Sequence, residues 1–203
     1  MLLKINPSNI DHRLIKTVIG VLKNDGVIIY PTDTVYAMGC DIYSNKAIEK
    51  ICRIKNVKPQ KSNFSFICSD LSHISDFTKP FDRSVYKMLN RSLPGPFTFI
   101  LNANSAVPAI FKNHKKTIGI RIPGHTVPLN IIKELGNPVM SASLHDENEI
   151  TEYLTDPSEI FEKFETTVDL IIDGGYGGNE PSTVVDCTGT QPVILRQGAG
   201  VLD

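Results

Sequence analysis

Polar side chains able to bind a small ligand follow one short apolar run near the N-terminus. Residues 26–29 read Gly-Val-Ile-Ile, and hydroxyls and a carboxylate come directly after them, on Thr32, Asp33, Thr34 and Tyr36. Pro31 ends a strand there because it has no backbone N–H to donate. In open α/β sheets, ligands tend to bind beyond the carboxyl ends of the strands. A β-turn rich in turn formers explains the pattern equally well, so both interpretations stay open.

A basic run lies on a second predicted helix and the loop after it. The run consists of Lys46, Lys50, Arg53, Lys55, Lys58 and Lys61, and Glu49 is the one acidic residue within it. Ammonium groups in such a run act as point charges toward phosphate. A solvated helix face is the common alternative.

Arg121 lies within the apolar segment 117–122, whose alternation places Thr117, Gly119 and Arg121 on one face of a strand. An unpaired buried charge is costly, so this arginine requires a partner. An internal carboxylate or a bound phosphate would serve. His125, just beyond, is better explained as a structural loop residue than as a base.

Three more strand ends carry polar groups. Ser141 and Ser143 follow a short apolar run, Ser182 precedes the strand 183–187, and Arg196 ends the strand 192–196. The glycine-rich segment 174–178 enters a strand rather than a helix and lacks the Gly-Lys-Ser/Thr ending of a P-loop, which excludes that kind of nucleotide site.

The chemistry that the sequence lacks is also informative. It contains no Gly-x-Ser-x-Gly elbow and no cluster with the spacing of metal ligands, so we predict no covalent nucleophile and no protein-held metal. Hydroxyls, two strand-end arginines and lysines suit the positioning and charge stabilisation of phosphates.

The elements that must position these groups alternate along the chain. Strands are predicted at 26–30, 64–68, 97–102, 117–122, 138–142, 168–172, 183–187 and 192–196. A first helix is predicted at about 14–22, with Asn9 or Asp11 as its cap, and a second helix begins after its cap Ser44. Further helices are predicted at 82–92, 126–135 and 157–165. This order predicts a single α/β domain, 1–203, around a twisted mixed sheet whose last three strands are more antiparallel. The segment 145–156 is acidic and reads as an exposed loop.

Composition fits one ordinary soluble globular domain. The chain has 203 residues, 41% of them hydrophobic, and a net charge of −1, which argues against a dedicated duplex-binding protein. No apolar run approaches the ~20 residues of a membrane span, and no signal peptide is evident. The four scattered cysteines favour a reducing, cytoplasmic location over a disulfide framework.

Taken in order, these segments resemble the YrdC-like family of threonylcarbamoyl-AMP synthases. The blocks that carry the resemblance run from about residue 10 to the C-terminus: Tyr-Pro-Thr-Asp-Thr-Val-Tyr at 30–36, Pro-Gly-Pro-Phe-Thr-Phe-Ile-Leu at 94–101, Gly-Ile-Arg-Ile-Pro at 119–123, Ser-Ala at 141–142, Ser-Thr-Val-Val-Asp at 182–186 and Leu-Arg-Gln-Gly at 195–198. The segment 62–71 looks closer still to the YciO-type branch.

The resemblance implies a YrdC-like fold with an open, positively charged cleft. It also implies a reaction that joins L-threonine, bicarbonate and ATP, with Mg²⁺, into threonylcarbamoyl-AMP and pyrophosphate, for threonylcarbamoyladenosine formation in tRNA. On the substrate side it places Thr32, Thr34, Tyr36, Arg121 and Ser182. At the nucleotide it places Lys55, Lys58, Ser141, Ser143 and Arg196.

The sequence departs from the family pattern at three places. The pattern Lys-x-Arg is here Lys55-Asn56-Val57, Ser-Ala-Asn is here Ser141-Ala142-Ser143, and a usually Ser/Gly-rich segment is here the acidic 145–156. Negative charge near a triphosphate is unfavourable. Two alternatives therefore stay open: a weakly catalytic or non-catalytic module that binds tRNA or double-stranded RNA, and a related ATP-dependent enzyme acting on a different amine.

Overall fold

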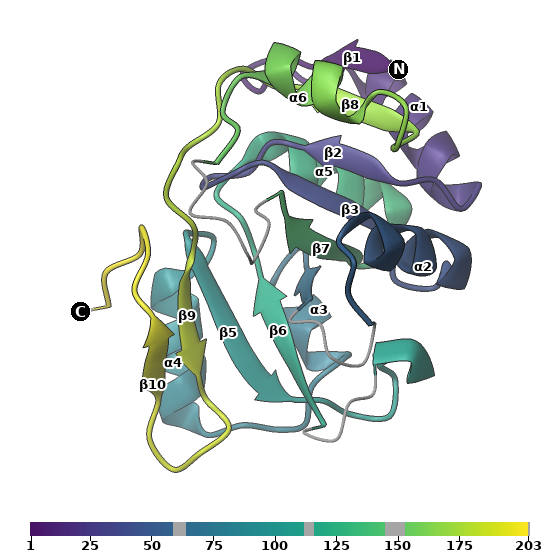
Figure 1. Ribbon diagram of the computed structural model, residues 1–203. Coiled ribbons are helices and arrows are strands. Elements are labelled where there is room, and N and C mark those ends of the chain that lie inside the picture. The colour runs from purple at the N-terminus through teal and green to yellow at the C-terminus, as the bar shows by residue number, and fades with distance from the viewer. Residues whose placement is uncertain (59–63, 112–115, 145–152, 203) are drawn as a thin grey trace.

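The computed structural model describes residues 1–58, 64–111, 116–144 and 153–202. Within them, the strands form one sheet in the order β1-β8-β2-β3-β7-β4-β6-β5-β9-β10. Figure 1 shows this sheet twisting from β1 at one end to β10 at the other. The strands are β1 (Leu2–Lys4), β2 (Ile28–Tyr30), β3 (Ala37–Asp41), β4 (Ser65–Ile67), β5 (Phe97–Asn102), β6 (Thr117–Arg121), β7 (Val139–Ser143), β8 (Leu170–Asp173), β9 (Thr183–Asp186) and β10 (Val193–Arg196).

The sheet is mixed, as predicted, but its directions are distributed differently. Strand β8 runs parallel to both β1 and β2, and β9 runs parallel to β5. Of the last three strands, only β9 and β10 form an antiparallel pair. The expected antiparallel group of three is therefore wrong. The reason is that residues 174–182, here called the strap, carry the chain from β8 at one side of the sheet to β9 at the other (Figure 1).

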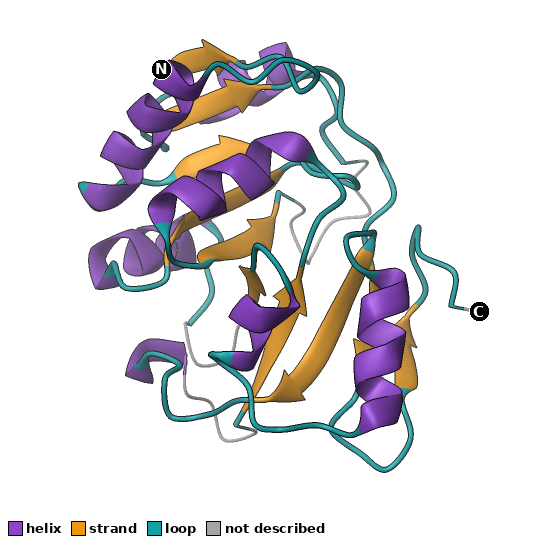
Figure 2. Ribbon diagram, turned by 180° about the vertical axis from the view of Figure 1, so that it is seen from behind, coloured by secondary structure: helices purple, strands orange, loops and turns teal. Residues whose placement is uncertain are grey.

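Helices cover both faces because β2 is buried on both. Ile28 and Tyr30 pack with α1 and α5 in one apolar cluster, while Val27 and Ile29 belong to a second cluster that includes residues of α2. Figure 2 shows the α1 and α5 side from behind. The helices are α1 (His12–Lys23), α2 (Asn45–Ile54), α3 (Leu71–Ser75), α4 (Arg83–Ser92), the 3-10 helix η2 (Ala109–Phe111), α5 (Thr126–Leu135) and α6 (Pro157–Phe164). None of these described helices is long and apolar enough to cross a bilayer.

Local capping explains where the helices begin. Asp11, one of the two predicted caps, accepts a hydrogen bond from the backbone N–H of Arg13, and Ser44 accepts one from Ala47. His125 caps α5 by accepting from the N–H of Val127, which confirms its structural role. Gly136, in the left-handed region at φ 80°, ends the same helix.

Four short elements were not predicted: β1, β3, α3 and η2. Strand β3 matters most, because it makes 31–36 the connection of a β2–β3 hairpin. Most of the predicted acidic loop 145–156, like Lys61, lies outside the described residues.

Candidate functional site

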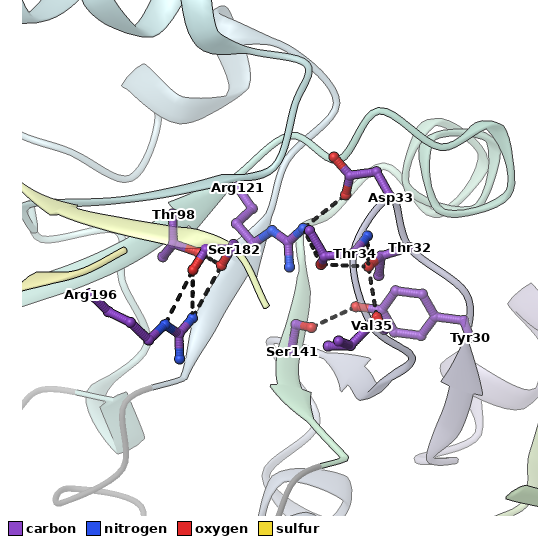
Figure 3. A network of polar contacts seen from close by, with 10 residues as sticks. All are labelled: Tyr30, Thr32, Asp33, Thr34, Val35, Thr98, Arg121, Ser141, Ser182 and Arg196. Atoms are coloured by element: carbon purple, nitrogen blue, oxygen red, sulfur yellow. Dashed lines mark hydrogen bonds and ion pairs between the residues drawn. The ribbon is translucent and has the colours of Figure 1, made fainter. Parts of the chain in front are cut away.

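The predicted polar residues converge where several strands begin or end. Arg121 closes β6, Ser141 lies in β7, Ser182 precedes β9 and Arg196 closes β10. Figure 3 shows Arg121 pointing toward Asp33 and Thr34 of the β2–β3 connection, while Arg196 points toward Ser182 and Ser141 toward Tyr30. The sheet thus brings together groups that come from five separate parts of the chain.

Arg121 and Asp33 form the buried centre of this site. Arg121 Nη2 donates to Asp33 Oδ1 at 2.8 Å and to Thr34 Oγ1 at 3.1 Å. The side chains are only 9% and 11% exposed, so the predicted partner is an internal carboxylate. Burial lowers the pKa of the Arg121 guanidinium, and Asp33 opposes that effect while Arg196 adds to it. A guanidinium nevertheless stays charged at any working pH.

The loop that carries Asp33 is fixed by its own hydroxyls. Thr32 Oγ1 donates to the carbonyl of Val35 at 2.7 Å and accepts from the N–H of Thr34 at 3.1 Å. The hydroxyls of Thr32 and Thr34 also lie 3.1 Å apart (Figure 3). Both residues are buried. The loop thus has internal hydrogen bonds of its own, in addition to those that Asp33 and Thr34 receive from Arg121.

A second guanidinium anchors the opposite wall. Arg196 Nη2 donates to the carbonyl of Ser182 at 2.8 Å and lies 3.4 Å from its hydroxyl. The hydroxyls of Ser182 and Thr98 share a hydrogen bond of 2.8 Å. Arg196 therefore holds the backbone from which Ser182 projects.

Ser141 accepts a hydrogen bond from a buried tyrosine of β2. The hydroxyl of Tyr30 donates to Ser141 Oγ at 2.8 Å. Burial raises the pKa of Tyr30 to about 12, so its hydroxyl stays protonated and remains a donor. The proton of Ser141 is consequently directed to some other acceptor.

The basic helix reaches this region through Lys55. Lys55 Nζ donates to the carbonyl of Ser143 at 2.9 Å, which joins the end of α2 to the end of β7. Lys58 is exposed on the loop beyond. By contrast, Lys46 pairs with Asp25 and Lys50 with Asp169, at 3.3 and 2.7 Å. Part of the predicted basic face is therefore neutralised within the fold.

The hydroxyl of Tyr36 is engaged elsewhere. It donates to the carbonyl of Gly175 at 2.7 Å and accepts from the N–H of Gly174 at 3.2 Å. Tyr36 thus ties the strap to the β2–β3 connection. The structure does not join it by hydrogen bonds to the Arg121 network.

Val57, where the family pattern has arginine, belongs to the end of α2. The N–H of Asn56 donates to the carbonyl of Arg53, and that of Val57 donates to the carbonyl of Cys52. Asn56 adopts a left-handed φ of 53°. These are the bonds of a Schellman motif, in which the residue at position 57 makes an apolar contact with the helix. Val57 is half-buried and packs against the main core cluster.

Sequence reasoning missed two members of the site, Tyr30 and Thr98, and named Asp33 without pairing it with Arg121. Asp33 had a signal, because the notable segment contains only that carboxylate and Arg121 needs one. Thr98 lies in the block 94–101 that carries the family resemblance, while nothing local distinguishes Tyr30 from an ordinary core tyrosine.

The donor set suits an anion better than a metal. Among the described residues, no group of three or more His, Cys, Asp or Glu side chains could hold a metal ion. Cys40, Cys52, Cys68 and Cys187 are all buried, and burial raises the pKa of every one of these thiols, so none of them is an activated nucleophile. Two guanidiniums, hydroxyls and an ammonium group are able to bind carboxylates and phosphates.

Comparison with known proteins gives concordant results. YciO of Escherichia coli K12, an uncharacterized protein, is 40% identical over 198 residues, which cover 97% of this chain and 94% of YciO. Its crystal structure superimposes with a TM-score of 0.92 over 99% of this chain and 97% of that one, at 38% identity. The threonylcarbamoyl-AMP synthase of Coxiella burnetii is 28% identical over 164 residues, which cover 81% of this chain and 87% of the synthase.

Sua5 of P. abyssi shares the fold. The crystal structure of P. abyssi Sua5 complexed with L-threonine has a TM-score of 0.88 over 98% of this chain, at 24% identity, and this chain spans 57% of it. A family model for Sua5, YciO and YrdC, described as "Telomere recombination", matches residues 20–198. The chain therefore belongs to the Sua5/YciO/YrdC family.

Proposed function

We propose that this protein forms threonylcarbamoyl-AMP from L-threonine, bicarbonate and ATP, releasing pyrophosphate, and that the product serves threonylcarbamoyladenosine formation in tRNA. The observation that carries the proposal is the pair of strand-end guanidiniums, Arg121 and Arg196, set among hydroxyls that include those of Thr34 and Ser182. A threonylcarbamoyl-AMP synthase among the relatives and a threonine-bound Sua5 with the same fold support it.

The reaction divides the site into two ends. At one end, Arg121 binds the threonine carboxylate, and Thr32, Thr34 and Ser182 orient the amino acid. At the other, Lys55, Lys58, Ser141, Ser143 and Arg196 hold the triphosphate in an open cleft of positive potential.

The chemistry needs positioning more than covalent catalysis. The threonine amine combines with bicarbonate, losing water, to form a carbamate. A carbamate oxygen then attacks the α-phosphorus of ATP, and the bond to the β-phosphate oxygen breaks to release pyrophosphate. Cationic side chains stabilise the charge that builds up on the phosphate oxygens. Because the described residues offer no acidic cluster, Mg²⁺ would be bound mainly by the triphosphate and would neutralise part of its charge.

An RNA-binding module is the weaker alternative. Its support was the basic run, and two of those lysines are paired with Asp25 and Asp169. Salt-dependent binding of tRNA or double-stranded RNA that persists without ATP would favour it. The buried free cysteines are compatible with work in a reducing cytoplasm, where tRNA is modified.

Pyrophosphate release tests the proposal. The purified protein is incubated with ATP, Mg²⁺, bicarbonate and L-threonine, with each component omitted in turn, and serine and other small amino acids replace threonine in parallel. We expect release to require all components and to be fastest with threonine. Release that ignores the amino acid would overturn the proposal, and faster release with another amine would identify a different substrate in the same cleft.

A further inference from the structure

The contact between Arg121 and Asp33 is a one-point ion pair. Of the two carboxylate oxygens, only Oδ1 receives a hydrogen bond from the guanidinium. Arg121 Nε and Asp33 Oδ2 are both buried, and the structure gives neither atom a hydrogen-bond partner. An arginine and a carboxylate can form two parallel bonds that satisfy such atoms. Buried polar atoms are rarely left unpaired, which makes this donor and this acceptor notable.

Asp33 lies in a loop that is fixed by more than its contact with Arg121. The flanking residues Thr32 and Thr34 fix the loop through hydrogen bonds to its own backbone. Gly124 lies nearby, and a Cβ built on it would be 3.5 Å from Asp33 Oδ2, so a side chain at position 124 would contact the second oxygen. The carboxylate is therefore a fixed negative charge beside Arg121 rather than a mobile counterion.

Without Asp33, the charge of Arg121 would add to that of the cations at the nucleotide end of the site. Arg196 lies close enough to lower the pKa of Arg121, and Lys55 reaches the end of β7. A site with several cations attracts multivalent anions in preference to a carboxylate that carries one charge. Asp33 makes the Arg121 pair neutral as a whole.

We propose that Asp33 is a positioning and specificity-determining residue, which orients Arg121 and makes this end of the site select a zwitterionic amino acid over phosphate-type anions. Arg121 supplies donors for the carboxylate of the amino acid, and the charge of Asp33 attracts its ammonium group. The same charge repels pyrophosphate from this end. This inference rests on the proposed function, since it concerns the threonine end of that site.

Binding measurements on matched variants test the inference. Asp33→Asn keeps the shape and the Oδ1 acceptor but removes the charge. Asp82→Asn is the control for net charge, because Asp82 is exposed and its side chain makes no capping hydrogen bond. Thr34→Val removes the uncharged acceptor of Arg121. The ligands are L-threonine, 3-hydroxybutanoate (threonine without its ammonium group) and pyrophosphate, each titrated by calorimetry.

We expect the wild-type protein and Asp82→Asn to prefer threonine over 3-hydroxybutanoate. In Asp33→Asn this preference should fall by about tenfold or more, as loss of a charge-assisted interaction predicts, and pyrophosphate should bind more tightly. Thr34→Val should weaken threonine and 3-hydroxybutanoate together and leave their ratio unchanged.

Each outcome decides a separate question. Unchanged ratios and unchanged pyrophosphate affinity in a folded Asp33→Asn protein would overturn the role of Asp33. If Thr34→Val changed the ratio of the threonine and 3-hydroxybutanoate affinities as much as Asp33→Asn does, Asp33 would be only a structural support, and its proposed role in specificity would also be overturned. Wild-type protein that binds pyrophosphate but not threonine would contradict the proposed function instead, and the pyrophosphate titration would still judge whether Asp33 excludes such anions.

Discussion

The hydroxyls of Tyr30 and Ser141 are joined by a hydrogen bond of 2.8 Å across the sheet, although 111 residues separate them in the chain. Strand β3 lies between their strands, β2 and β7, so the Tyr30 side chain passes across one face of β3 to reach Ser141. Gly39 of β3 makes room for it, since a Cβ there would come within 2.9 Å of the Tyr30 ring. A core residue thus sets the orientation of a site hydroxyl.

Tyr30→Phe should weaken nucleotide binding more than it weakens the fold. Without the tyrosine donor, the Ser141 hydroxyl is free to rotate and to turn its proton away from the ligand. A neutral hydrogen bond of this kind contributes about 0.5–1.5 kcal/mol, so ATP affinity should fall by roughly two- to tenfold. Calorimetric titration with ATP measures it. Tyr86→Phe, at an exposed position on α4, is the control and should bind ATP as the wild type does.

The strap offers a second prediction, at Gly178. A Cβ on this glycine would lie 2.3 Å from the carbonyl oxygen of Thr34, a backbone atom that cannot move without its loop. Gly178→Ala should therefore displace the β2–β3 connection and weaken threonine binding by at least tenfold. Binding as tight as in the wild type would show that the strap and the loop are not mechanically coupled.

The matched control for this change is Gly20→Ala in α1. A Cβ at Gly20 meets nothing within 4 Å, and alanine is the better helix former by about 0.5–1 kcal/mol. This variant should unfold at a slightly higher temperature and bind threonine normally. The opposite responses of two Gly→Ala changes separate a local backbone clash from a general effect of alanine.

Local signals made much of this fold predictable. Caps at Asp11 and Ser44 and the alternation in 117–122 depend on a few adjacent residues, and α1, α2 and β6 appear where these elements were expected. Strand β3 was missed because Ala37–Asp41 contains a glycine and follows a run of turn formers. Its strand conformation comes from pairing with β2 and with β7, about a hundred residues away.

Most residues of the site could be named from the sequence, but the contacts between them could not. The cost of burying Arg121 indicated a partner, yet the choice between a carboxylate and a phosphate depended on a residue 88 positions away. The position of β9 could not be read from loop length, because the strap crosses from one side of the sheet to the other. Such long-range pairings are set by the whole core rather than by neighbours in sequence.

Acid should destabilise the fold through His125. Burial lowers the pKa of this histidine below 6.5, although Asp33 opposes the effect, and its Nδ1 must stay unprotonated to accept the N–H of Val127. A histidine with a lowered pKa stabilises the fold fully above about pH 6.5, and that contribution is lost as the pH falls through the folded-state pKa. The melting temperature of the wild type should therefore decrease between pH 7 and pH 5.

His125→Asn separates this cap from other acid effects. Asparagine caps helices well and does not titrate, so the variant should lose less thermal stability over the same pH range. Part of the decrease should persist, because burial also lowers the pKa of His73, whose Nδ1 accepts the N–H of Ser69. A variant that melts with the same pH dependence as the wild type would contradict the assignment to His125.

Val57→Arg tests whether this chain lacks a catalytic guanidinium. The sequence pattern alone predicts a gain of activity if the missing charge limits the reaction. The structure predicts otherwise, because Val57 follows the left-handed Asn56 in a Schellman motif and packs against the core. An arginine there must turn its charge out to solvent and give up part of that apolar contact.

We expect Val57→Arg to lower stability by about 1 kcal/mol, which shifts the melting temperature by roughly 2–4 °C in a domain of this size, with no gain in pyrophosphate release. Val57→Leu keeps the apolar contact and should match the wild type in both measurements. A rise in release of tenfold or more, at an unchanged melting temperature, would show that position 57 faces the triphosphate after all. The expected result would mean instead that the end of α2 has become part of the core in this chain.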